Sequence, residues 1–150
     1  MKPNKSPRKI IKRLALGFVI ILILAVSGYY VGTRANLNPK DTVGEVIDSL
    51  DGVYVYYNGG TGNGSGRNTS SDGYNIGLKY QCVEFVKRYY YEHYKHKMPD
   101  SYGHAKDFFD SSIADGRLSK RRNLIQYTNP RSSITQTGDL LVYGPTAGHP

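Results

Sequence analysis

Residues 80–90, with the sequence YQCVEFVKRYY, contain the only cysteine of the chain. A cysteine in the first turn of a helix lies in the partial positive charge of the helix N-terminus, which favours a thiolate. Gln81 places an amide donor beside the position where an oxyanion would form during attack on a carbonyl group. Two interpretations of Cys82 follow: a nucleophile that needs a histidine base, or a small apolar side chain buried on the core face of its helix.

Four histidines are candidates for that base. His149 follows a predicted strand near the end of the sequence, and His104 lies near the start of the helix predicted after the cysteine helix; both stay open as the base. His93 and His96 are three residues apart, but together with Cys82 they match no familiar spacing of zinc ligands. We therefore expect no metal site and no cofactor.

The residues around Cys82 have the apolar periodicity of an amphipathic helix from about residue 81 to residue 96. Glu84 and Arg88 stand in the i, i+4 order that favours an ion pair, on the side of the helix opposite Cys82. Gly77 precedes the helix and lets the backbone approach its first turn closely. The sequence thus predicts a loop-to-helix junction at the cysteine.

Three further elements are predicted before this helix. Apolar residues at i, i+3, i+4 and i+7 predict a helix over residues 43–50. Alternating β-forming residues predict a strand over residues 53–57. The glycine-rich stretch 58–73 is predicted to be a mobile loop, and it lacks the lysine that ends a phosphate-binding loop.

The pattern after the cysteine helix is weaker. Residues 102–112, following Ser101 as a cap, are predicted to form a helix. Residues 115–137 are polar and rich in turn-forming residues, and the basic run 120–122 is expected to be solvated. A strand is predicted over residues 139–143. Helices combined with strands in this order predict an α+β domain over residues 42–150.

Residues 14–33 contain no charged side chain. A helix of this length spans about 30 Å, the thickness of the hydrocarbon core of a bilayer. The six basic residues in the segment 1–13 predict a cytoplasmic N-terminus and an exported remainder. We expect a single-pass anchor over 14–33 and a linker over 34–41; the small residues 25–27 leave a cleaved signal peptide as the alternative.

The formal net charge of +8 is not distributed over the whole chain. Eight of the twenty basic residues, and none of the twelve acidic ones, lie in the first forty residues. The remainder therefore has equal numbers of both signs. A nucleic-acid-binding domain needs its positive charge on the folded part, so we expect no nucleic-acid partner.

The stretch GLKYQCVEFVKRYY, residues 77–90, resembles the signature of the CHAP family, the cysteine- and histidine-dependent amidohydrolases/peptidases. The resemblance continues in GHAKDFF at 103–109 and in GDLLVYGPTAGH at 138–149, and it spans roughly residues 43–149. The segment is also similar to the amidase domain of bifunctional glutathionylspermidine synthetase/amidase.

The resemblance implies a papain-like α+β fold, in which N-terminal helices pack on an antiparallel sheet. It makes Cys82 the nucleophile and Gln81 a residue that positions the substrate and the oxyanion. The base is His149 or, if His149 belongs to the turn, a histidine on a strand beyond the end of this sequence. In the family an Asn, Asp or Glu on the next strand orients the histidine. The sequence has no such residue after His149, so we expect a domain that is incomplete at its C-terminus and lacks its last strands.

Export and resemblance together predict a bacterial, membrane-anchored cysteine amidase or endopeptidase that faces the cell wall and cleaves amide bonds of peptidoglycan. The expected partners are a peptidoglycan peptide as substrate and the lipid bilayer; the oligomeric state stays open. One alternative is a non-catalytic wall-binding or assembly protein. A further alternative is an amidase acting on a glutathionylspermidine-like small amide.

Overall fold

The computed structural model describes residues 7–36, 38, 40–100, 102–128 and 134–144. The chain divides into two compact units. The first unit comprises residues 1–41 and 59–63, and the second comprises residues 42–58 and 64–150.

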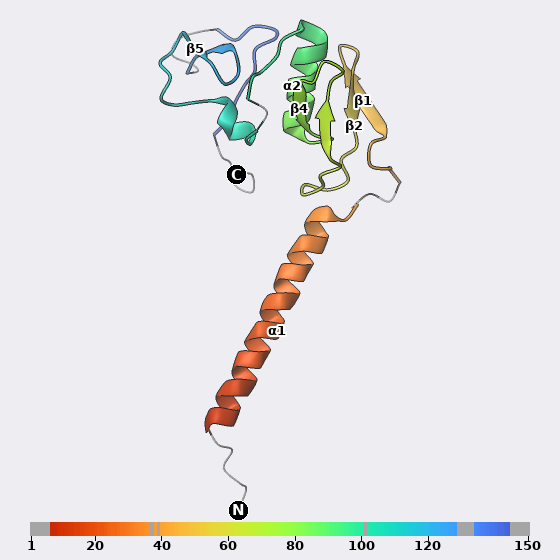
Figure 1. Cartoon of the computed structure of the whole chain (residues 1–150), viewed down its shortest axis with the longest axis vertical. Helices are drawn as coiled ribbons and strands as arrows, with labels where there is room; N and C mark the ends of the chain where they lie inside the picture. Colours follow the sequence, from red (N-terminus) through yellow and green to blue (C-terminus); the bar gives the residue numbers. More distant parts are fainter. Residues whose placement is uncertain (1–6, 37, 39, 101, 129–133, 145–150) are drawn as a thin grey trace, which may run out of the picture. The chain divides into compact units, whose positions relative to one another are not determined.

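The first unit contains one long helix, α1 (Pro7–Arg34), drawn from red to orange in Figure 1. None of its residues is buried, and its length and composition suit a signal sequence or a membrane anchor. The apolar helix predicted over 14–33 is confirmed, and it begins two turns earlier than predicted. At its other end the Gly62 N–H donates a hydrogen bond of 2.8 Å to the Thr33 carbonyl, which satisfies one of the last backbone acceptors of the helix.

In its described residues the second unit is an α+β structure with three separate two-stranded antiparallel sheets. The predicted fold class is thereby confirmed at this level. In chain order its elements are β1 (Val46–Leu50), β2 (Val53–Tyr56), β3 (Arg67–Thr69), β4 (Asn75–Leu78), α2 (Cys82–Tyr94), the 3-10 helix η1 (Ala105–Phe108), β5 (Arg117–Ser119) and β6 (Leu124–Gln126).

The prediction of a helix over 43–50 is wrong, because this segment forms β1 and pairs with β2 in a hairpin. Asp51 and Gly52, with φ of 48° and 82°, form the tight turn, and Asp-Gly is a strong signal for this type of hairpin. The ladder has a bulge between Val46 and Asp48. A bulge inserts an extra residue, so it shifts the apolar alternation and produces a spacing that resembles a helix.

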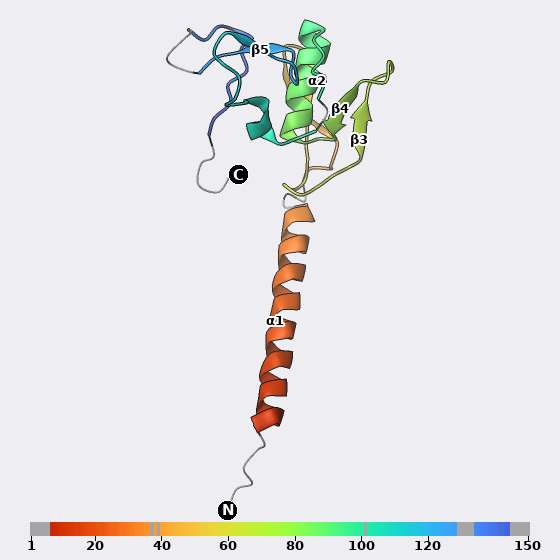
Figure 2. The ribbon, with the colours of Figure 1, turned by 60° about the vertical axis from the view of Figure 1, so that its left-hand side comes forward.

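The predicted cysteine helix is confirmed as α2, which lies beside the β3–β4 hairpin (Figure 2). Strand β3 lies inside the glycine-rich stretch that was expected to be a loop. On the other side of α2, the apolar core consists of Tyr90, Met98 and Phe108, each less than a tenth exposed. The core holds α2 against the segments that follow it.

The two elements predicted after α2 are largely wrong. Only the four residues of η1 are helical within 102–112, because Phe109 is already extended (φ −112°, ψ 134°); the expected cap Ser101 lies outside the described residues. In the described part of the chain, residues 139–143 pair with no strand. Leu140 and Val142 instead pack their side chains against the apolar core. The stretch expected to be turn-rich contains the β5–β6 hairpin.

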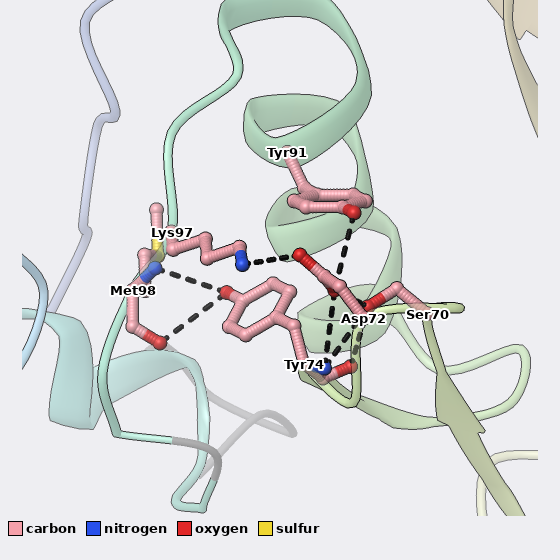
Figure 3. Close-up of polar contacts among 6 residues, drawn as sticks. All are labelled: Ser70, Asp72, Tyr74, Tyr91, Lys97 and Met98. Carbon is pink, nitrogen blue, oxygen red and sulfur yellow. Dashed lines mark hydrogen bonds and ion pairs between the residues drawn. The ribbon is translucent and has the colours of Figure 1, made fainter.

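A cluster of polar side chains connects the β3–β4 turn with the segment after α2 through hydrogen bonds (Figure 3). The Asp72 carboxylate accepts hydrogen bonds from Ser70 and from the Lys97 ammonium group. These two donors hold the pKa of Asp72 well below its usual range, with Lys97 the larger cause. The Tyr74 hydroxyl donates to the Met98 carbonyl at 3.3 Å and accepts from the Met98 N–H at 3.0 Å. The hairpin and the end of α2 are therefore connected by side chains.

Candidate active site at the start of α2

Cys82 is the first residue of α2, and its side chain is exposed. Gln81 precedes the helix in an extended conformation (φ −73°, ψ 156°), and its carbonyl accepts the first helical hydrogen bond, from the Phe85 N–H at 3.0 Å. The interpretation of the cysteine as a buried apolar side chain is therefore wrong. An exposed thiol at a helix start is accessible to an electrophile, as a nucleophile must be.

The close approach predicted at Gly77 is present. Its φ is +145°, and a Cβ atom there would lie 3.3 Å from both Cα and Cβ of Glu84. Strand β4 thus passes directly against the first turn of α2. Only glycine combines this backbone conformation with this contact at little cost.

Gly77→Ala is expected to lower the free energy of unfolding of the second unit by about 1–3 kcal/mol, because alanine is strained at this φ and its methyl group crowds Glu84. Denaturant unfolding followed by the near-ultraviolet circular dichroism of the tyrosines measures the change. Gly66→Ala is the control, since φ there is also positive (+86°) but no neighbouring atom lies within 4 Å of the added methyl group. An equal loss in both variants would show that backbone strain alone, and not the contact with α2, sets the cost.

The first turn of α2 is held by a buried ionic network. The Glu84 Oε1 atom accepts hydrogen bonds of 2.7 Å from Arg88 Nε and from Asn68 Nδ2 of β3. Both charged side chains are buried, and the Arg88 guanidinium lies 4.8 Å from the centre of the Tyr56 ring of β2. The predicted ion pair is confirmed, and the side of α2 that carries it is buried. The charged side of α2 faces the two hairpins, which anchor the turn that carries Cys82.

Two buried cations, Lys87 and Arg122, donate hydrogen bonds to the same backbone carbonyl group. Lys87 Nζ donates to the carbonyls of Asn75 (2.8 Å) and Asp100 (3.2 Å), and Arg122 also donates to the Asp100 carbonyl (3.0 Å). Burial, followed by the charge of Arg122, lowers the pKa of Lys87 to about 8. Arg122 was expected to be solvated, and it is only 1% exposed because it lies on the Phe108 ring, 3.9 Å from its centre.

The stability of the second unit is expected to rise between about pH 8 and pH 9.5, by up to about 2 kcal/mol. The folded-state pKa of Lys87 lies below its ordinary value, so in this window the unfolded chain binds more protons, and raising the pH favours the folded form. Unfolding in denaturant at pH 7, 8, 9 and 9.5 measures the slope. Lys87→Met should remove the slope, whereas Lys120→Met, at an exposed position, should retain it; a slope that persists in Lys87→Met would contradict the assignment.

The described histidines have other partners. His93 is eleven residues after Cys82 on the same helix, which places it about 16 Å away along the axis; its ring stacks on Tyr89. The ring of His96 is hydrogen-bonded to a backbone carbonyl through Nε2. His104 is exposed and precedes η1. His149 lies outside the described residues, so the structure brings together Cys82 and Gln81 but assigns no base.

No described part of the chain places three or more histidine, cysteine or acidic side chains together as a metal site. A hollow lies between η1, the β5–β6 hairpin and residues 140–144, and its lining is mostly apolar. Cys82 does not line it.

The burial of Lys87 and Arg122 could not be predicted from the residues next to them in the sequence. The first hairpin could have been predicted from the Asp51-Gly52 turn.

Comparisons with protein-family models, with curated proteins and with solved structures give no match to this chain. A function for the site must therefore be argued from the residues themselves.

Proposed function

We propose that this chain is a membrane-anchored, exported cysteine amidase or endopeptidase that cleaves amide bonds of peptidoglycan. The observation that carries the proposal is the exposed thiol of Cys82 at the first position of α2, directly after Gln81. The resemblance of residues 77–90 to the CHAP signature supports it, and a papain-like CHAP arrangement is part of the same proposal. The long apolar helix α1 supports an anchor with the second unit outside the membrane.

In the proposed reaction Cys82 Sγ attacks the carbonyl carbon of the amide and forms a carbon–sulfur bond. The thiol proton passes to an imidazole, for which His149 is the proposed residue. Collapse of the tetrahedral intermediate breaks the carbon–nitrogen bond, and the imidazolium gives its proton to the leaving amine. Water then hydrolyses the thioester and releases a carboxylic acid and the free thiol. The backbone N–H of Cys82 and the side-chain amide of Gln81 donate hydrogen bonds to the oxyanion.

Incubation of the purified full chain with purified peptidoglycan tests the reaction class. New primary amino groups, without new reducing sugar ends, are the expected products. A parallel incubation with a glutathionylspermidine-like amide tests the small-amide alternative. If no amino groups appear from either substrate while the protein binds peptidoglycan, the chain is a non-catalytic wall-binding protein.

Two histidine variants test the base. His149→Ala is expected to lower the rate of amine release strongly, whereas His104→Ala is expected to leave it near the wild-type level. The reverse order would move the base to His104. Full activity in both variants would exclude both His149 and His104 as the base.

Gln81→Ala is expected to lower kcat by about 100-fold, the usual effect of removing one donor to an oxyanion. The Michaelis constant should change little, because the hydrogen bond strengthens as negative charge develops. Steady-state kinetics on a soluble peptide fragment of the substrate separates the two constants. An increase in KM with unchanged kcat would instead assign Gln81 to ground-state binding.

A further inference from the structure

The first two turns of α1, residues 7–13, precede the uncharged stretch and have two distinct faces. At 100° per residue the four basic side chains fall within an arc of about 140°; they are Arg8, Lys9, Lys12 and Arg13. Ile10, Ile11 and Leu14 fall within about 100° on the opposite side. All of these side chains are exposed. This segment is therefore an amphipathic extension of the apolar helix.

The length of α1 places this extension at a defined depth in a bilayer. Its 28 residues span about 42 Å, compared with about 30 Å for the hydrocarbon core and about 40–45 Å for the bilayer with its headgroups. When residues 14–33 fill the hydrocarbon core, residues 7–13 extend about 10 Å beyond it. The basic arc then lies at the level of the lipid headgroups.

The chain provides no negative charge for these cations within the helix. The first turn of α1 has no acidic residue, and the sequence has none before Asp41. Cations in the first turn of a helix are also disfavoured by the helix dipole. An anion from outside the chain would therefore stabilise this end of α1. The other end has one basic residue, Arg34, which stacks on Tyr30 with 4.8 Å between the guanidinium carbon and the ring centre.

We propose that Arg8, Lys9, Lys12 and Arg13 form a binding site for anionic phospholipid headgroups. The basic arc contacts the phosphates at the depth of the lipid headgroups, beyond the hydrocarbon core that residues 14–33 fill. Each of several adjacent cations adds to the attraction toward an anionic membrane surface, and this attraction is screened by salt. This site rests on the retention of α1 in the membrane, as in the proposed function, but it does not require amidase activity.

Lipid retention by the full chain tests this site. The chain is incorporated into nanodiscs with equal phosphatidylglycerol and phosphatidylcholine in both leaflets, so that its orientation does not matter, and the lipids that stay bound on release are counted by native mass spectrometry. We expect phosphatidylglycerol to be retained at least about five-fold over phosphatidylcholine at low salt, and the preference to fall in 0.5 M salt.

The quadruple substitution of Arg8, Lys9, Lys12 and Arg13 by Gln should abolish the preference while keeping the helix, since glutamine is a good helix former. The matched control replaces four exposed cations elsewhere with Gln: Lys40, Lys106, Arg117 and Lys120. It should retain the preference. Equal loss in both variants, or no preference in the wild type, would overturn the site.

A soluble competitor separates a lipid site from a phosphate site. Glycerol phosphate at millimolar concentration should not displace the bound phosphatidylglycerol, because it lacks the acyl chains that hold the phosphate of a lipid at the depth of the basic arc. Displacement would show a site for free phosphate and overturn the assignment to lipid. Both quadruple variants keep Cys82, so amine release from peptidoglycan reports separately on the proposed enzyme.

Discussion

Arg88→Met is expected to destabilise the second unit by about 3–5 kcal/mol. The substitution removes the charge that faces Glu84 at 2.7 Å, and Glu84 is only 1% exposed. A buried carboxylate without its partner either stays charged at high cost or takes up a proton. Its other carboxylate oxygen, Oε2, already accepts no hydrogen bond from the residues that the structure describes, so the neutral amide of Asn68 on Oε1 would be the one remaining donor among them.

A double substitution distinguishes loss of the ion pair from loss of packing. Arg88 also contacts the rings of Tyr56 and Phe85, and methionine keeps most of this apolar contact. Adding Glu84→Leu to Arg88→Met removes the uncompensated charge and should recover a large part of the stability.

Denaturant unfolding of the full chain in detergent, followed by tyrosine circular dichroism, gives the free energies for this cycle. Arg117→Met, at an exposed position in β5, is the control and should change stability by less than about 0.5 kcal/mol. A cost below about 1 kcal/mol for Arg88→Met would mean that the pair contributes no more than a surface salt bridge.

Cys82→Ala is expected to reduce kcat for amide cleavage by at least about 10⁴-fold, because no other group replaces a covalent nucleophile. The side chain is exposed, so the free energy of unfolding should change by less than about 0.5 kcal/mol. The combination of lost activity and unchanged stability distinguishes a catalytic role from a structural one.

Mass spectrometry provides a second readout for this cysteine. A slowly hydrolysed substrate should add one acyl group to Cys82 in the wild type and none in Cys82→Ala. Retention of more than about a tenth of the activity in Cys82→Ala would exclude the thiol as the nucleophile.

The local sequence pattern was sufficient to predict an element whose own residues specify its type and length. The apolar helix and the helix that begins at the cysteine are both present, the first with two additional turns at its start, because hydrophobic periodicity and length specify them. The helix predicted over 43–50 was wrong because the Asp51-Gly52 turn and a bulge outweighed a spacing that fits both structures. Short apolar patterns of this kind do not separate helix from strand.

The orientation of α2 could not be deduced from the helix alone. Periodicity assigned Glu84 and Arg88 to one side, but it did not reveal that the β3–β4 hairpin and β2 cover that side. Asn68 reaches Glu84 across sixteen positions in the sequence, and Lys87 reaches Asp100 across thirteen. Contacts at this separation depend on how the hairpins pack, which a local pattern does not encode.

By itself the sequence determined a long apolar N-terminal helix, a unique cysteine at the start of a helix, and Gln81 beside it, because each depends on residues close together in the chain. Only the tertiary structure decided that Cys82 is exposed and that the charged side of its helix is buried. The physical reason is that burial of Lys87, Arg88 and Arg122 is tolerated only where distant carbonyl, carboxylate and aromatic groups come to meet them.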